Sequence, residues 1–322
     1  MGSVPSYQRI FVTGSGGVLG YGMRSIRQEY PGSEFIFGTK EDCNLLDLPM
    51  ALERIRFARP DALVHLAAVS GGVVLSKKHP ASLLRDSVLM TVHVLEIART
   101  LQIPKVVMTL SGGMYPPSAP LPIKEESIHD GPAHESNDSY AYAKRLIEPA
   151  IRAYRSEFGV NAIGLVPNGI FGPGDKFTSE AATFIAALIQ RFFENRDNDS
   201  PIVVWGDGSP LRQVTFSDDM ARSFLWALFH YDGPEILNVG TPEEHSIREI
   251  AWMLADELSI DRQRIVFDPA KPGGVFRKGL DVSKFLRLSQ FHYAPLRTGL
   301  RRTFQWLRDH DEAVLTGGGG VP

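Results

Sequence analysis

The chain has 322 residues, 43% of them hydrophobic, and a net charge of −3 with a pI near 6.3. This length supports a large core or two closely joined lobes, and the mild acidity argues against nucleic acid or a membrane surface as a partner. The lone cysteine, Cys43, cannot form an intrachain disulfide or a metal cluster, and no apolar stretch is long enough to span a membrane. With no signal-peptide core after Met1, these features predict a cytoplasmic protein that holds no metal.

The first predicted element is a strand over residues 9–13, followed by a glycine-rich turn and a helical pattern up to residue 30. Glycine at 14 permits a tight turn, at 17 lets backbone amides approach a pyrophosphate, and at 20 lets helix and strand pack closely. The helix N-terminus also favours phosphate charge. This strand, turn and helix predict a dinucleotide site whose contacts are Gly14, Gly16, Gly17, Val18 and Gly20.

A second predicted strand, over residues 34–38, ends at Thr39 and Lys40. An NAD site usually places a carboxylate here for the ribose hydroxyls, whereas NADP needs room and a cation for its additional phosphate. Thr39 and Lys40 therefore favour NADPH. Glu41 and Asp42 follow directly, and a shift of one or two positions would put a carboxylate at the ribose. Asp47 is expected near the adenine.

Three further apolar runs predict strands over residues 62–68, 105–110 and 162–166. The first contains His65, which we interpret as a core or edge histidine, and ends in the run Leu66-Ala67-Ala68. The second delivers Ser111 at its carboxyl end, where ligands bind in open parallel sheets. After the third strand the chain continues through Pro167 to a Gly-Pro turn. Strands that alternate with helices predict an α/β fold with a doubly wound parallel sheet of the Rossmann type.

Tyr140 and Lys144 stand four positions apart in a predicted helix and therefore share one face. A Lys ammonium beside a phenol favours the phenolate, so this pair can act as a tuned proton donor. Reduction of a ketone by hydride needs such a donor for the growing alkoxide and a second hydrogen bond that holds the carbonyl, which Ser111 can supply. These three residues are the predicted catalytic groups of a ketone reductase with a dinucleotide cofactor.

The motifs together carry a family resemblance. Gly14-x-x-Gly17-x-x-Gly20, His65-Leu66-Ala67-Ala68, Ser111, Tyr140-x-x-x-Lys144 and Phe171-Gly172-Pro173 resemble the extended short-chain dehydrogenase/reductase superfamily. More narrowly, residues 8–312 are similar to the GDP-L-fucose synthases, which epimerise C3 and C5 of GDP-4-keto-6-deoxy-mannose and reduce C4 with NADPH. The resemblance implies NADPH as cofactor and a GDP-linked keto-sugar as substrate. The implied cofactor contacts beyond the glycine turn are Thr39, Lys40, Asp47, Leu66, Ala67, Ala68, Lys144 and Pro167.

The resemblance also implies two lobes. Residues 8–172 are expected to form the NADP-binding Rossmann domain, to which residues 214–240 return, and residues 173–213 and 241–312 a smaller C-terminal α/β lobe over the nucleotide-sugar. Residues 313–322 are expected to be a flexible tail. Arg212 and Lys278 match cations at the substrate diphosphate, and Trp205 matches an aromatic near the sugar-nucleotide. The full set of implied substrate contacts is Gly113, Asn137, Asn168, Thr183, Arg191, Trp205, Arg212 and Lys278.

The chain departs from the fucose synthases at the residues that move protons during epimerisation. In that family a Cys lies two positions after the catalytic Ser and a His follows the Gly-Pro turn, whereas Gly113 and Thr183 occupy these positions here. Glycine has no side chain, and a Thr hydroxyl has far too high a pKa to act as a base without an activating partner. His129 and His134 are alternative bases, which we interpret instead as substrate-loop or surface residues.

We therefore predict an NADPH-dependent reductase of the C4 ketone of a GDP-4-keto-6-deoxy-sugar that does not epimerise its substrate. Glycine at 113 and 169 would widen the pocket, so the sugar is a hexose or a heptose. One alternative is a bifunctional fucose synthase whose epimerisation residues are unidentified. An alternative of another class is a non-catalytic NADP-sensing protein, which would not need Ser111, Tyr140 and Lys144 together. A 4,6-dehydratase is disfavoured because residues 110–114 contain no carboxylate.

Pro149 lies five positions beyond Lys144 in what is predicted to be one long helix. A proline inside a helix removes a hydrogen bond and clashes with the preceding turn, at a cost of about 3 kcal/mol unless the helix bends. In relatives this helix contributes to a four-helix homodimer interface. We expect a homodimer whose geometry at this helix is altered.

Overall fold

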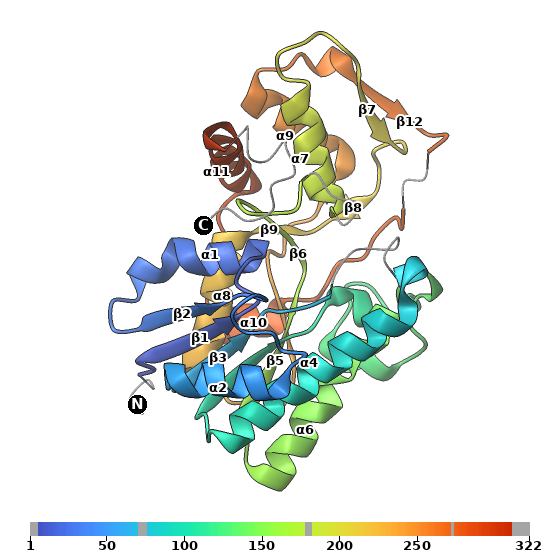
Figure 1. The fold of residues 1–322 in the computed structure, drawn as a ribbon. Helices are drawn as coiled ribbons and strands as arrows, with labels where there is room; N and C mark the ends of the chain where they lie inside the picture. Colours follow the sequence, from blue (N-terminus) through green and yellow to red (C-terminus); the bar gives the residue numbers. More distant parts are fainter. Residues whose placement is uncertain (1–5, 70–75, 178–181, 272–273, 311–322) are drawn as a thin grey trace.

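The computed structural model describes residues 6–69, 76–177, 182–271 and 274–310, which form two lobes (Figure 1). The larger lobe is built on a six-stranded sheet in the order β10-β5-β4-β3-β1-β2, in which every neighbouring pair is parallel. Its strands are β1 (Arg9–Thr13), β2 (Glu34–Gly38), β3 (Ala62–His65), β4 (Lys105–Thr109), β5 (Ala162–Pro167) and β10 (Leu237–Val239). The predicted doubly wound parallel sheet is confirmed. The predicted tail, residues 313–322, lies outside the described residues.

Both faces of this sheet are buried, because consecutive apolar side chains of a strand point to opposite sides. In β1, Ile10 and Val12 pack into one core and Phe11 into another. Helices α1 (Val18–Ile26) and α8 (Ser217–His230) cover the first side, and α10 (Ser283–Ser289) joins them near β10. Helices α2 (Leu48–Ala58), α4 (Pro80–Thr100) and α6 (Ile147–Phe158) cover the second (Figure 1).

The smaller lobe has its own apolar core, formed by α7 (Phe184–Glu194), α9 (Ile247–Leu258) and α11 (Leu296–Asp309). Large aromatic side chains dominate it, among them Phe192, Phe193 and Phe304. Strand β7 (Ile202–Trp205) pairs in parallel with β12 (Ile265–Asp268) at its outer side. Strand β8 (Leu211–Arg212) pairs antiparallel with β11 (His245–Ser246) on the side that faces the larger lobe (Figure 1).

The segment that passes from β8 into α8 first pairs outside the central sheet. Residues 214–216 form β9 (Val214–Phe216), which pairs with β6 (Gly169–Phe171) in a separate two-stranded sheet and does not join the central one. Residues 217–230 then form α8 against the central sheet, and residues 237–239 enter that sheet as β10. The return to the larger lobe is therefore made by α8 and β10.

The helix that contains Pro149 is interrupted. Helix α5 (Asp138–Arg145) ends before Leu146, and α6 begins at Ile147, so that Pro149 falls in the first turn of the second helix. There its missing N–H costs little, because the first amides of a helix have no intrahelical partner. The Leu146 amide still donates to the Tyr142 carbonyl at 3.0 Å, so the two helices follow closely on one another. The sequence favoured a bend at Pro149, and the helix breaks three residues earlier, at Leu146.

Candidate functional site

The glycine turn has the geometry that a dinucleotide needs. Gly14 has φ +67, and a Cβ there would lie 2.4 Å from the Ala67 backbone, while a Cβ on Gly20 would lie 2.3 Å from the Ser15 carbonyl oxygen. Both positions therefore require glycine. Gly17 is the N-cap of α1 without a side-chain cap, and a Cβ on Gly16 would meet nothing within 4 Å. The first amides of α1, which begins at Val18, thus have no side-chain cap, and the N-terminus of such a helix favours an anion.

Asp42, a carboxylate after β2 that could have favoured NAD, is held by Thr39 of its own loop and by Arg54. Asp42 accepts hydrogen bonds from the Thr39 amide at 2.6 Å and the Thr39 hydroxyl at 3.0 Å, and it pairs with Arg54 at 3.0 Å. Backbone and side-chain hydrogen bonds from Thr39, with those of Arg54, outweigh burial and lower the pKa of Asp42. Lys40 is exposed. Asp47 is also exposed and caps α2 by accepting from the Met50 amide at 3.0 Å.

The next strand end carries His65 and the run from Leu66 to Ala68. His65 is fully buried, and its Nδ1 lies 2.9 Å from the Thr13 hydroxyl. Burial, and secondarily the nearby Lys144 charge, lower the pKa of His65 to about 3. It is therefore a neutral core histidine, as predicted. Leu66 and Ala67 are partly buried and Ala68 is exposed, at the carboxyl edge of the sheet beside Gly14.

The predicted reaction centre gathers around Gly113. Ser111 caps the short 3-10 helix Gly112–Met114, and its Oγ accepts from the Gly113 amide at 3.1 Å. A Cβ on Gly113 would lie 3.3 Å from Ser111 Oγ and 3.9 Å from both Tyr140 Cε1 and Asn137 Nδ2. The Asn137 amide oxygen accepts from Ser76, which orients it. The structure thus brings together Ser111 as the proposed hydrogen-bond donor, Tyr140 as the proposed proton donor, and the side-chain amide of Asn137.

Lys144, on the same helix as Tyr140, donates to the backbone at the end of β4. Its ammonium is buried and donates to the Thr109 carbonyl, at the end of β4, at 2.8 Å. Burial lowers the pKa of Lys144 to about 8. Burial raises the pKa of Tyr140, and only a hydrogen bond with Ser111 opposes it. The ammonium is directed to a backbone carbonyl, and a lowering of the Tyr140 pKa by Lys144 stays a prediction. Pro167, at the end of β5, lies near the same turn, with its carbonyl 3.7 Å from a Cβ on Gly112.

Two predicted substrate residues come from different segments of the smaller lobe. Arg212 donates to the carbonyls of Leu211 at 2.8 Å and Val275 at 2.9 Å, and its guanidinium lies 5.5 Å from the centre of the Phe184 ring. Lys278 is exposed two positions before Leu280, a residue whose backbone is held by Gln213. Because Gln213 is the direct neighbour of Arg212, it joins the two cationic segments.

The other predicted substrate residues are spread more widely. Trp205 is exposed at the end of β7, and Arg191 donates to the carbonyl of Val203 in the same strand. Thr183 caps α7, where its Oγ1 accepts from the Ala186 amide at 3.3 Å. Asn168 joins the two lobes: its side chain accepts from the Thr215 hydroxyl at 2.7 Å and donates to the Thr241 carbonyl at 3.0 Å. Their contact with a substrate stays a prediction.

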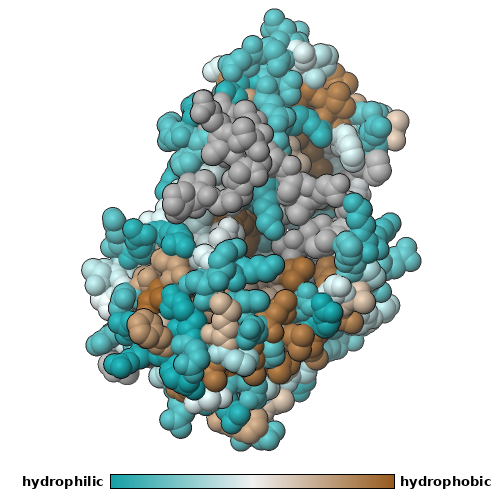
Figure 2. Space-filling model, in the orientation of Figure 1, coloured by the Kyte–Doolittle hydropathy of each residue, from teal (hydrophilic) through white to brown (hydrophobic). Residues whose placement is uncertain are grey.

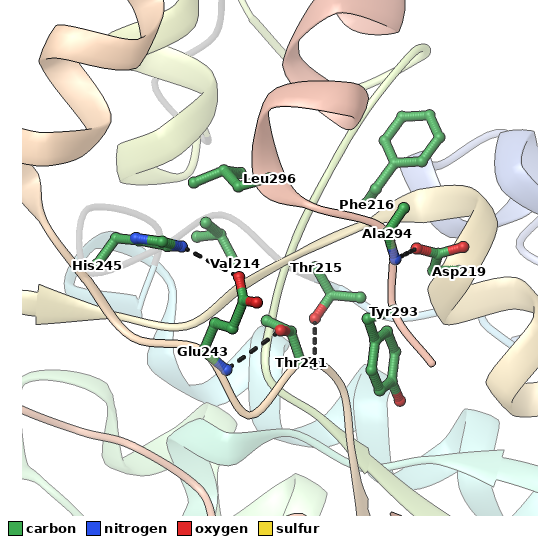
Figure 3. A pocket seen from close by; sticks show the side chains of 10 residues that line it. All are labelled: Val214, Thr215, Phe216, Asp219, Thr241, Glu243, His245, Tyr293, Ala294 and Leu296. Carbon is green, nitrogen blue, oxygen red and sulfur yellow. Dashed lines mark hydrogen bonds and ion pairs between the residues drawn. The ribbon is translucent and has the colours of Figure 1, made fainter. Parts of the chain in front are cut away.

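A small cavity lies at the junction of the lobes, lined by residues of β9, α8, β11 and the segment before α11 (Figure 3). It measures about 10 Å³, which is room for about one water. Figure 3 shows the Thr215 hydroxyl, which accepts from the Thr241 amide at 2.8 Å, and Asp219, which accepts from the Ala294 amide at 2.8 Å. None of the predicted catalytic residues lines it. We interpret it as a packing gap between the lobes.

Sequence reasoning missed two residues that the structure brings into these sites. Arg24, on the second turn of α1, donates to Ser15 in the glycine turn at 3.1 Å. Gln213 clamps Leu280 through both its amide nitrogen, at 3.1 Å, and its amide oxygen, at 2.8 Å. Arg24 could have been predicted from its position a few residues after the glycine turn. For the second, the family resemblance includes Arg212-Gln213, but the contact itself could not be predicted because Leu280 is 67 positions away.

None of the helices in the described ranges is long and apolar enough to cross a membrane. The same ranges contain no group of three or more His, Cys, Asp or Glu side chains that could hold a metal ion.

Comparison with known proteins agrees with this geometry. A GDP-L-fucose synthase of Dictyostelium discoideum is 30% identical over 319 residues, which cover 98% of this chain and 99% of that protein. The crystal structure of a GDP-L-fucose synthetase of Naegleria fowleri bound to NADP is 30% identical, with a TM-score of 0.86 over 95% of both chains. A GDP-mannoheptose C4 reductase of Campylobacter jejuni with NADP bound shares the fold, with a TM-score of 0.83, 21% identity and coverage of 95% of this chain and 100% of that one.

The family assignment covers most of the larger lobe and its return segment. Residues 10–240 match the NAD dependent epimerase/dehydratase family, a range that runs from β1 to the residue after β10. The range contains the glycine turn, Ser111, Tyr140 and Lys144. The predicted resemblance to the extended reductases is thereby confirmed, and the chain belongs to the NAD-dependent epimerase/dehydratase family, within the extended short-chain dehydrogenases/reductases.

Proposed function

We propose that the protein is an NADPH-dependent reductase of the C4 ketone of a GDP-4-keto-6-deoxy-sugar, a hexose or a heptose, and that it does not epimerise C3 or C5. The observation that carries the proposal is the composition of the space around Gly113. Ser111, Asn137 and Tyr140 surround the point where a side chain at this position would begin. Groups that can assist reduction are present there, whereas the acid–base side chain that the fucose synthases carry is missing.

The proposed step is a hydride reduction with one proton transfer. NADPH, when bound, supplies the hydride to C4. Tyr140 gives its phenolic proton to the carbonyl oxygen as that oxygen becomes an alkoxide, so the ketone becomes an alcohol. The Ser111 hydroxyl donates a second hydrogen bond to the same oxygen, and Lys144 holds a positive charge below Tyr140 and binds the nicotinamide ribose. Orientation and stabilisation of the alkoxide account for most of the rate gain.

Each residue that could replace the missing epimerisation base has another partner. The Thr183 hydroxyl accepts from the Ala186 amide, and His129 lies 3.1 Å from the Glu148 carboxylate at the start of α6. His134 accepts from the Ser136 amide at 3.2 Å in the short 3-10 helix before α5. With Gly113 unable to move a proton, epimerisation lacks both of its groups.

The cations of the smaller lobe support a nucleotide diphosphate as the rest of the substrate. Arg212 is partly buried, forms no ion pair among the described residues, and has its pKa lowered by burial. An unpaired guanidinium of this kind gains from binding a dianion. The names of the relatives favour one alternative, a bifunctional GDP-L-fucose synthase. A non-catalytic NADP-sensing role is disfavoured by the proximity of Ser111 and Tyr140.

The test is a pair of matched tyrosine variants. Tyr140→Phe is expected to lose about 10²- to 10⁴-fold in kcat, because the general acid is gone, while NADPH affinity stays close to that of the parent. Tyr142→Phe serves as the control, since Tyr142 is exposed on the same helix. Turnover is followed by NADPH oxidation and cofactor affinity by calorimetry. Near-normal turnover of Tyr140→Phe would overturn the assignment.

We also propose that the protein forms a homodimer through α4 and the broken helix pair α5 and α6. Apolar side chains gather on the face of the larger lobe over these helices (Figure 2). The exposed ones include Leu84 and Leu89 on α4, Leu146 between α5 and α6, and Phe158 at the end of α6. Burial of such a patch favours association. Light scattering should give twice the chain mass of 35.6 kDa, and a monomer would refute the proposal.

A further inference from the structure

Arg24 is a partly buried guanidinium without a carboxylate partner. It lies on the second turn of α1, donates through Nη2 to Ser15 Oγ at 3.1 Å, and forms no ion pair with any described residue. Burial and the neighbouring Arg27 lower its pKa, and only Asp42 at longer range opposes them. A cation in such surroundings is stabilised by an anion that binds beside it. The described part of the chain supplies no such anion.

The surroundings of Arg24 locate that anion at the end of β2. Ser15 Oγ donates to the Gly38 carbonyl at 3.1 Å, and the Ser15 amide donates to the same oxygen at 3.2 Å. The guanidinium also lies 4.1 Å from the centre of the Phe37 ring, against which it stacks. Arg24 is therefore fixed between the glycine turn and the last residues of β2. In a sheet of this type the adenosine ribose of a dinucleotide lies at that point.

The carboxylate nearest to this point cannot compete for Arg24. Asp42 is held by the Thr39 amide, the Thr39 hydroxyl and Arg54. Arg54 in turn is occupied by Asp42, and Lys40 is exposed. Gly16 leaves open space next to Ser15, since a Cβ there would meet nothing within 4 Å. The edge of the guanidinium not bonded to Ser15 can thus meet a ligand.

We propose that Arg24 forms the subsite for the phosphate monoester on the 2′-oxygen of the adenosine ribose, and that it is the main determinant of the preference for NADPH over NADH. This inference rests on the proposed use of NADPH. Stacking on Phe37 holds the planar guanidinium so that its N–H groups can bind two phosphate oxygens. Thr39 supplies a neutral neighbour, and the charge of Asp42 is offset by its ion pair with Arg54.

The test measures cofactor binding alone, by titration calorimetry with NADP⁺ and NAD⁺ and without any sugar. Arg24→Ala is expected to bind NADP⁺ about ten- to a hundredfold more weakly and NAD⁺ within about twofold of the parent. Arg27→Ala is the matched control, because Arg27 is exposed at the start of the 3-10 helix that follows α1 and should leave both affinities unchanged. Lys40→Ala should reduce NADP⁺ affinity by less than threefold, as expected for an exposed cation.

The pH dependence of binding distinguishes recognition of the 2′-phosphate from a general structural effect of the substitution. The second ionisation of a phosphate monoester lies near pH 6, so NADP⁺ affinity of the parent should rise as the pH passes about 6, while NAD⁺ affinity should not. This rise should be weaker in Arg24→Ala and retained in Arg24→Lys, which keeps the charge. Equal loss of NADP⁺ and NAD⁺ affinity, or an unchanged preference in Arg24→Ala, would overturn the inference. Equal affinity of the parent for both cofactors would instead refute the proposed use of NADPH.

Discussion

The space beside Ser111 can be tested by filling it. Gly113 has a negative φ, so alanine fits its backbone, and a Cβ there would lie 3.3 Å from Ser111 Oγ, a few tenths of an ångström closer than an ordinary contact. The gain of about 0.4–1 kcal/mol from replacing glycine should roughly offset this crowding. Gly113→Ala should therefore keep its unfolding free energy within about 1 kcal/mol of the parent. Any larger kinetic effect then reports on the substrate.

If the sugar occupies this space, the added methyl group crowds it. Overpacking by one methyl costs about 1–3 kcal/mol, so kcat/KM for the keto-sugar should fall roughly ten- to a hundredfold, while NADPH affinity stays unchanged. Gly112→Ala is the control, because its Cβ would make an ordinary contact of 3.4 Å with Leu280 Cδ1. Steady-state kinetics and denaturant unfolding are measured on both variants. Unchanged kinetics in a folded Gly113→Ala would show that the substrate does not use this space.

Two more predictions concern the groups around the site. The pKa of Lys144 is about 8 in the folded protein against an ordinary value of 10.5, so kcat/KM should fall as the pH rises through about 8. The unfolding free energy should rise between about pH 8 and 10.5, since the unfolded chain binds more protons than the folded chain there. A pH profile in which kcat/KM stays constant up to pH 10 would contradict the role of Lys144. Gln213→Ala leaves the Leu280 amide and carbonyl without partners. This variant should lower the unfolding free energy by about 2 kcal/mol. It should also raise KM for the nucleotide-sugar more than it changes kcat. An effect on kcat alone would show that the contact of Gln213 with Leu280 does not support substrate binding.

Much of the sheet was predictable, because its signals are local. The predicted strands at residues 9–13 and 34–38 match β1 and β2 in full. The strand predicted at 62–68 ends earlier, at His65, since the chain must turn there to pass over Gly14. Gly14 and Gly20 are predictable for the same local reason: each lies where backbone approaches backbone too closely for a side chain.

What could not be predicted depends on contacts between distant segments. Strand β9 has three residues, too few for a pattern to name its partner, and it pairs with β6 rather than with the central sheet. Asp42 looked free to bind a ribose, but Arg54 of α2 holds it. The ammonium of Lys144 looked available to Tyr140, but the end of β4 presents the Thr109 carbonyl to it. In each case the contact joins segments that are brought together only when the chain folds.

The central claim is reduction at C4 without epimerisation, and the product of one reaction tests it most directly. The protein is incubated with NADPH and GDP-4-keto-6-deoxy-mannose in deuterium oxide, and the product is examined by NMR and mass spectrometry. The account predicts a product that is reduced at C4 and carries no deuterium at C3 or C5, because Gly113 and Thr183 cannot exchange those protons. Deuterium at both positions in a fucose product would contradict it.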